Sequence, residues 1–132
     1  TQKLQSSNVS TLSYSAGICA GYFILPRKVN NNLEYGAWDQ CATTDPNALY
    51  VHELTVFARQ KNTNSWIWYR KPPTMTSPAW QRYQSTITVF IANSCVDGNT
   101  HDFHVWVYPT VHGVKFSPFE SDSVRVACGL AG

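Results

Sequence analysis

The chain has few charged residues: they make up 14% of its 132 residues, well below the roughly 25% typical of soluble domains. It also has no apolar run near the roughly 18 residues that a membrane-spanning helix needs, and no long stretch with the apolar spacing of an amphipathic helix. We therefore expect no membrane span and little or no helix.

Recognised chemical motifs are also missing. The four cysteines form no C-x-x-C pair, which argues against the usual zinc and thioredoxin-like sites. The chain has no G-x-S-x-G, no H-E-x-x-H and no phosphate-binding glycine loop. We therefore expect a protein without a cofactor that is not an enzyme, and we keep a small secreted hydrolase as an alternative.

Short β-branched and aromatic runs are present instead, and Asn, Gly, Pro and Asp clusters separate them. Apolar side chains alternate with polar or aromatic ones in residues 50–59, 86–92 and 102–109, the spacing of half-buried strands. The sequence predicts one domain over residues 1–132. This domain would be an all-β, two-sheet β-sandwich of about seven or eight antiparallel strands.

The connections between these strands can also be predicted. Val29-Asn30-Asn31-Asn32 would connect the two strands of one hairpin, and His112-Gly113 would form another turn. Residues 66–70 are expected to form a strand. Residues 71–79 contain three prolines and are expected to form a long irregular loop.

The even number of widely spaced cysteines favours two disulfides, and hence an oxidising compartment. A hairpin centred near Asn30 places Cys19 opposite Cys41. Cys95 and Cys128 each follow a strand, and these two strands would run in the same direction, so both residues would lie at one end of the domain. We therefore favour Cys19–Cys41 and Cys95–Cys128 over the two alternative pairings, and expect a secreted, extracellular protein.

The part of the chain from Cys95 to Cys128 resembles the end of an immunoglobulin-like or fibronectin-like sandwich in strand spacing and turn placement. It lacks the Cys…Trp…Cys signature of antibody domains. The resemblance implies a general architecture and no particular function. One sequon, Asn8-Val9-Ser10, would accept a glycan in a eukaryotic source.

An uneven distribution of charge gives the strongest functional signal. No acidic residue lies between Glu53 and Asp97, and this interval contains five of the ten basic residues together with several Trp and Tyr residues. Trp, Tyr and Arg are the residues that most often anchor interfaces. We predict a basic-aromatic binding surface formed by Arg59, Trp66, Trp68, Arg70, Lys71, Trp80, Arg82 and Tyr83.

The histidine-rich turn His101-Asp102-Phe103-His104 could suggest a metal site, but no third ligand stands at a defining spacing. We expect a polar turn with a solvent-facing His104 and no metal. The net charge of +2 is low for a nucleic-acid-binding protein, so we expect no nucleic acid as a partner.

The predicted function is that of a secreted recognition protein, such as an effector, toxin-like factor, inhibitor or adhesion module. Its partner would be an extracellular protein or glycan. The alternative is a carbohydrate-binding module in which Trp66 or Trp68, Trp80 and Tyr83 stack on sugar rings.

Overall fold

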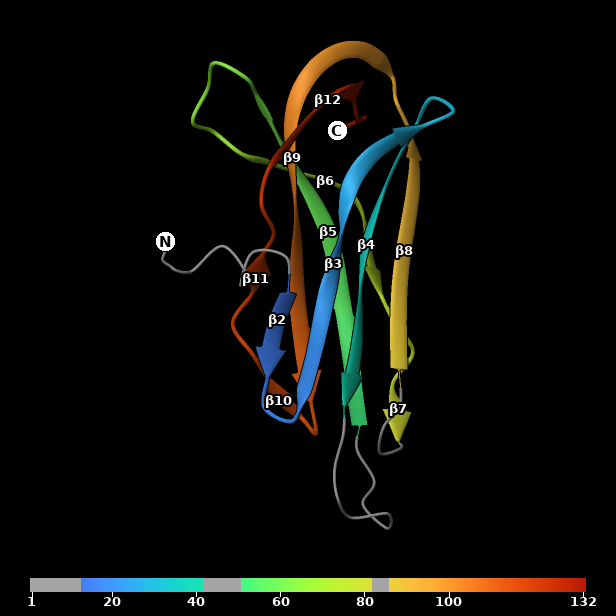
Figure 1. Cartoon of the computed structure of the whole chain (residues 1–132), viewed down its shortest axis with the longest axis vertical. Helices are drawn as coiled ribbons and strands as arrows, with labels where there is room; N and C mark the ends of the chain where they lie inside the picture. The colour runs from blue at the N-terminus through green and yellow to red at the C-terminus, as the bar shows by residue number, and fades with distance from the viewer. Residues whose placement is uncertain (1–12, 42–50, 82–85) are drawn as a thin grey trace.

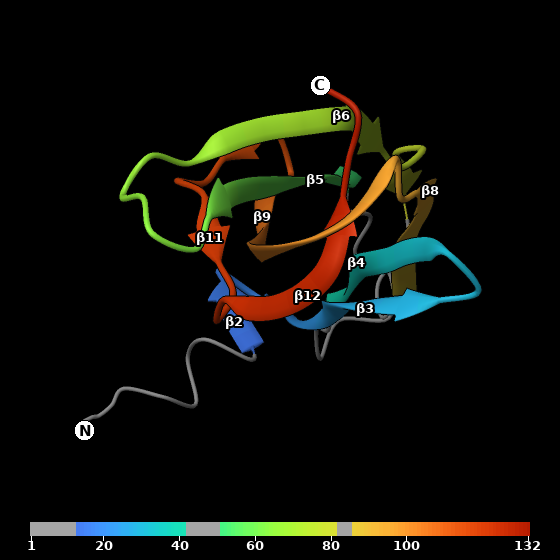
Figure 2. The same ribbon diagram turned by 90° about the horizontal axis from the view of Figure 1, so that it is seen from above.

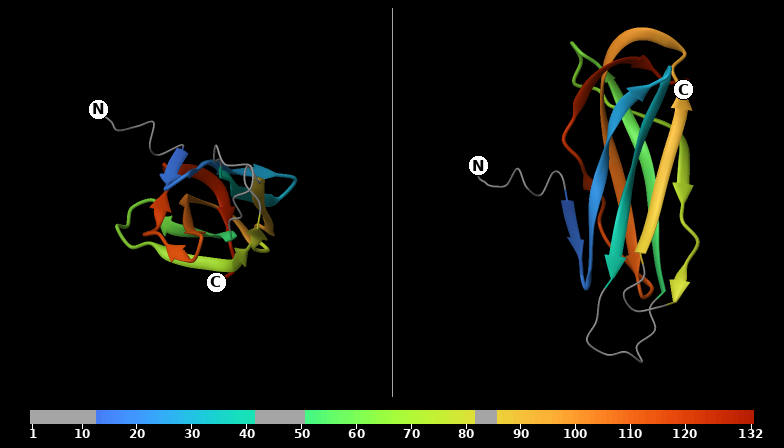
Figure 3. Two further views of the ribbon diagram at one scale, coloured as in Figure 1. Left: turned by 90° about the horizontal axis from the view of Figure 1, so that it is seen from below. Right: turned by 45° about the vertical axis from the view of Figure 1, so that its right-hand side comes forward.

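The computed structural model describes residues 13–41, 51–81 and 86–132. It is an all-β sandwich of two antiparallel sheets, which confirms the predicted fold class (Figures 1 and 2). The smaller sheet has the order β2-β3-β4-β8, and these four strands lie side by side in the right-hand view of Figure 3. Their bounds are Ser13–Ala16 for β2, Cys19–Val29 for β3, Asn32–Cys41 for β4 and Thr86–Ser94 for β8.

In the described part of the chain the larger sheet has seven strands, and the long strand β9 lies at its centre. β9 pairs with β5, β10, β11 and β12, while β5 also pairs with β6 and β7. The bounds are Val51–Asn62 for β5, Tyr69–Thr76 for β6, Trp80–Gln81 for β7, Asp97–Val111 for β9, Val114–Lys115 for β10, Phe119–Glu120 for β11 and Val124–Gly129 for β12. Among the described residues, no helix could span a membrane.

The alternation in the sequence sets which face of each strand is buried. Every second side chain of β5, of β8 and of β9 from Phe103 onward points into the space between the sheets, because successive side chains of a strand lie on opposite faces. The core is therefore made of aliphatic and aromatic side chains from both sheets, among them Leu33, Tyr35, Leu54, Val56, Ala58, Ile87, Val89, Ile91, Phe103, Val105 and Val107.

The two predicted hairpin turns are present. Asn30 and Asn31 have φ angles of 49° and 66° and connect β3 to β4, and His112 and Gly113 connect β9 to β10 with φ angles of 52° and 83°. Two successive residues with positive φ make the turn whose twist matches paired strands, and Asn and Gly adopt this conformation most readily.

Residues 66–79 differ from the prediction. The chain is irregular over residues 63–68, and the strand β6 then runs through Pro72 and Pro73, which a cis peptide bond joins. β6 is an edge strand. An edge strand tolerates proline because one side of it needs no hydrogen-bond donors. The expected strand at residues 66–70 was therefore wrong for residues 66–68, and the expected loop at residues 71–79 was wrong for residues 71–76.

Both predicted disulfides are present. Cys19–Cys41 links directly paired positions of β3 and β4. Cys95 follows β8 in the smaller sheet and Cys128 lies in β12 in the larger one, so Cys95–Cys128 joins the two sheets. Two hydrogen bonds strengthen this end of the sandwich, from Lys28 Nζ to the Ala127 carbonyl at 2.9 Å and from the Val96 amide to the Gly129 carbonyl at 2.7 Å.

Candidate functional site

The outer face of the seven-stranded sheet carries most of the described aromatic and basic side chains of the predicted surface. Core residues occupy the inward positions of β5 and β9, so the alternate positions point outward. These outward positions, together with Trp68 and Arg70, form what we call the basic-aromatic face: Phe57, Arg59, Lys61, Trp68, Arg70, His104, Trp106 and Tyr108.

Trp68 covers His104 on this face. Their rings are parallel within 9°, with centroids 4.0 Å apart, and His104 is only 4% exposed. The expected solvent-facing His104 is therefore wrong, because sequence spacing gave no indication that residue 68 would fold over it. Burial, with a further contribution from the charge of Arg59, lowers the pKa of His104 to about 4. Glu120 lies 4.0 Å from Nδ1, but its side chain is largely exposed and solvent screens its charge.

Both arginines of the face lie against aromatic rings. The guanidinium of Arg59 is 4.4 Å from the centroid of the Trp106 ring, and that of Arg70 is 4.0 Å from the centroid of Phe57. Such cation–π contacts contribute about 0.5–1 kcal/mol each at exposed sites. Neither arginine forms an ion pair with a carboxylate of the described residues. Their charges are therefore held in place and remain available to a partner.

Asp102 neutralises the upper end of the face. Its carboxylate accepts a hydrogen bond from Arg125 at 2.9 Å and forms an ion pair with Lys61 at 2.9 Å. The hydrogen bond from Arg125, followed by the contribution of Lys61, lowers the pKa of Asp102 below its ordinary value. Because Asp102 forms ion pairs with both Lys61 and Arg125, its carboxylate has a structural role.

A loop at residues 63–68 projects from the sandwich between β5 and β6 (Figure 1). Within this loop, Trp66 is 95% exposed and Ile67 is 58% exposed. The backbone of the loop is nevertheless held, because the Ser65 amide donates to the Asn62 carbonyl and the Ile67 amide to Ser65 Oγ, both at 3.0 Å. The loop thus exposes the Trp66 indole to solvent on a backbone held by two hydrogen bonds.

The structure brings only some of the predicted residues together. Arg59, Trp68 and Arg70 lie on the basic-aromatic face, and Trp66 projects beside it. Lys71 pairs with the inward-facing Ala58 and so points away from that face.

The remaining predicted residues cannot be placed on the face. Trp80 is described only through its strand pairing with His52. Arg82 and Tyr83 lie outside the described residues.

Sequence reasoning missed the contribution of β9 to the face. Because the search stopped at Asp97, where acidic residues resume, it did not include His104, Trp106 and Tyr108. The alternation of these residues with buried Phe103 and Val105 was already visible, and it assigns all three to one outer face.

One group of potential metal ligands occurs among the described residues, namely Cys19, Cys41 and His52. His52 Nδ1 lies 3.0 Å from Cys41 Sγ. The two sulfurs are joined in a disulfide, and a disulfide sulfur is not the thiolate that zinc binds. This group therefore does not make a metal centre.

Comparison with protein-family models, with curated proteins and with solved structures gave no match to this chain.

Proposed function

We propose that this chain is a secreted, non-enzymatic recognition protein. It binds an extracellular macromolecule through the basic-aromatic face and the adjoining loop at residues 63–68. The proposal rests above all on the exposure of Trp66. Its side chain is 95% exposed, although burying a side chain of this size normally contributes several kcal/mol.

The surroundings of Trp66 support the same conclusion. Trp68, two residues further on, is stacked on His104 and anchors the base of the loop. Arg59 and Lys61 lie 5.8 Å and 5.6 Å from the centroid of the Trp68 ring. The exposed Trp66 side chain can anchor an interface, and the adjacent cationic face can speed association with an acidic partner. Together they combine a source of affinity with a source of association rate.

A platform for stacking neutral sugars is less well supported on this face. One face of the Trp68 ring is stacked on His104, and two cations lie 5.8 Å and 5.6 Å from its centroid, so a neutral sugar would compete with these groups for the ring. The two disulfides are compatible with the extracellular location that the proposal requires.

The test compares Trp66→Ala with Phe90→Ala, a matched control on β8 in the other sheet. Phe90 is also exposed, at 47%. Each immobilised variant is incubated with a fractionated extracellular extract, and the retained partner is then titrated against the purified protein. We expect Trp66→Ala to weaken binding about 30-fold, the equivalent of roughly 2 kcal/mol for an interface anchor, while Phe90→Ala binds as the wild type does.

Trp66→Ala should also leave the thermal unfolding midpoint unchanged, because the side chain contributes little to the core. If the wild type and both variants bind equally, the loop is not the recognition element. If only Phe90→Ala loses the partner, the binding surface lies on the smaller sheet and the proposal is wrong.

A further inference from the structure

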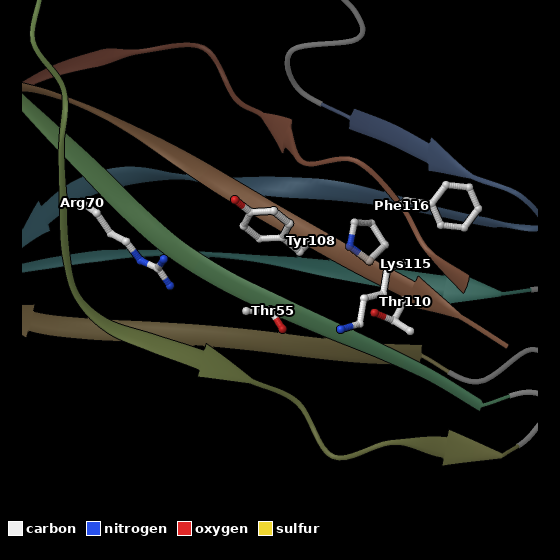
Figure 4. Close-up of a pocket in the computed structure, with 7 residues that line it drawn as sticks. Thr55, Arg70, Tyr108, Thr110, Lys115 and Phe116 are labelled. Carbon is white, nitrogen blue, oxygen red and sulfur yellow. The ribbon is translucent and has the colours of Figure 1, made fainter. Parts of the chain in front are cut away.

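The lower part of the basic-aromatic face contains a pocket of about 230 Å³. Side chains from four strands and the chain just after β10 surround it (Figure 4). Its lining residues include Thr55, Arg70, Tyr108, Thr110, Lys115 and Phe116. The volume is below the roughly 300–1,000 Å³ of pockets for drug-sized ligands, so the pocket accepts one small chemical group or one residue of a longer chain.

Two cations of this pocket converge on the same space. Arg70 reaches it from β6 and Lys115 from β10, and Figure 4 shows the two side chains pointing toward one another with Thr55 between them. Arg70 donates through Nε and one terminal nitrogen to Thr74 Oγ1, at 3.2 Å and 2.8 Å. These bonds hold the guanidinium in position and leave its other terminal nitrogen available as a donor.

No described carboxylate forms an ion pair with Arg70 or Lys115. Glu53 is the nearest acid in the strand register, since it pairs with Thr110 and lies on the same face of β5 as Thr55. Two positive charges directed at one partly enclosed space repel each other, and an anion between them removes that repulsion. The electrostatics of the pocket therefore favour a negatively charged group.

The rest of the lining adds hydroxyl groups and an apolar wall. Thr110 and Tyr108 each contribute a hydroxyl, and Thr55 Oγ1 keeps bonding capacity beyond its 2.9 Å contact with Thr76. Pro109 and Phe116 supply apolar surface. An acidic side chain of a protein would satisfy the two cations alone. A sugar ring with an acidic group would also bond the hydroxyls and place its C–H face on the apolar wall.

We propose that the pocket formed by Arg70, Lys115, Tyr108 and Thr110 binds an acidic sugar residue of an extracellular glycan. The anionic group, a carboxylate or a sulfate, lies between Arg70 and Lys115, and the sugar hydroxyls meet Thr110 and Tyr108. This inference rests on the proposed function and specifies its partner as an anionic glycan.

The experiment is calorimetric titration of the full chain with a hexamer of α-1,4-linked galacturonic acid at about 0.15 M salt, where long-range electrostatics is largely screened. The matched neutral probe is the methyl ester of the same hexamer. A sulfated dextran hexamer distinguishes sulfate from carboxylate, and hexaglutamate represents an acidic protein. We expect at least one of the acidic sugar hexamers to bind, and the methyl ester to bind at least tenfold more weakly than the free acid or not at all.

Three variants locate the binding. Lys115→Gln and Arg70→Gln should each weaken binding of the acidic hexamer at least tenfold, the effect of removing a charge-assisted hydrogen bond. Lys28→Gln is the matched control, because Lys28 is an exposed lysine of β3 that donates to the carbonyl of Ala127. It should change binding less than twofold. Lys115 is exposed, so Lys115→Gln should leave thermal unfolding unchanged.

Absence of binding by both acidic sugars overturns the inference, and so does an equal loss in Lys115→Gln and Lys28→Gln. Hexaglutamate binding as tightly as the sugar, with the same dependence on Lys115, overturns the sugar assignment. A partner that Lys115→Gln retains and Trp66→Ala loses leaves the recognition function standing without the pocket. If instead Trp66→Ala retains the partner and Lys115→Gln loses it, the pocket binds the partner and the loop is not the recognition element.

Discussion

Asp39 makes the stability of this protein depend on pH in a direction unusual for a carboxylate. It lies on the inner face of β4 and is 1% exposed. Neither carboxylate oxygen has a hydrogen bond of good geometry among the described residues. Burial raises the pKa of Asp39 from its ordinary 3.8 to about 6, and the nearby Tyr14 hydroxyl and Gln40 amide offset only part of that effect.

The direction of the effect follows from proton binding. Between pH 3.8 and about 6 the folded state holds a proton on Asp39 that the unfolded chain has already released. Stability therefore falls as the pH rises through this window. A pKa raised from 3.8 to about 6 corresponds to a loss of about 3 kcal/mol, a large share of the roughly 5–15 kcal/mol that stabilises a domain.

His104 opposes Asp39 over much of the same range. Its pKa falls from 6.5 to about 4 on folding, so its contribution to stability rises as the pH rises between these values. Burial lowers the pKa of His52 in the same direction. The wild-type profile alone would therefore conceal the contribution of Asp39, and the informative quantity is the difference between the wild type and Asp39→Asn.

The assay is urea unfolding of both proteins at closely spaced pH values. The side-chain amide that Asp39→Asn introduces does not titrate, so its own effect on stability is a constant offset. We expect the free energy of unfolding of the wild type, relative to the variant, to fall by about 3 kcal/mol between about pH 3 and pH 7. A flat difference, or one that rises with pH, would refute the reasoning, because it would mean that the folded protein accommodates the charged carboxylate.

Two further predictions concern stability. Replacing Cys95 and Cys128 together by serine should lower the free energy of unfolding by about 3–4 kcal/mol, because the bond closes a loop with a sequence separation of 33 residues; urea unfolding of the double variant measures this, and an unchanged midpoint would contradict it. Gly21→Ala should cost about 2 kcal/mol or more, because the new methyl group would overlap the ring of Tyr14 and the carbonyl of Trp38. Gly98→Ala is its control, with no atom within 4 Å of the added carbon, and equal midpoints for the two variants would show that the site at Gly21 relaxes freely.

Local sequence determined most of the strand architecture. Alternation of apolar and other side chains identified the inner and outer faces of β5, β8 and β9, because a strand places successive side chains on opposite faces whatever its neighbours are. The stretch Val29-Asn30-Asn31-Asn32 predicted the connection between β3 and β4, and its two central residues have the positive φ that Asn adopts readily. The prediction of a hairpin centred near Asn30 placed Cys19 opposite Cys41, and the structure reaches this pairing through a register shift between Ile24 and Arg27.

Only the tertiary structure decided how the strands are divided between the sheets. β8 and β9 follow one another in the chain, yet they belong to different sheets. The Cys95–Cys128 pairing was predicted correctly, but the prediction did not show that this bond joins the two sheets. Sheet membership depends on which apolar faces pack together, a long-range choice that no short pattern encodes.

The candidate site shows the same division. A basic and aromatic interval in the sequence predicted a binding surface, since Trp, Tyr and Arg are the residues that most often anchor interfaces. The sequence could not show that Trp68 folds over His104 or that Lys71 points away from Arg70. It also could not show that Arg70 and Lys115 line one pocket. The distance between these two residues is set by the pairing of β5 with β6 and of β9 with β10. That pairing forms only when the whole sandwich assembles.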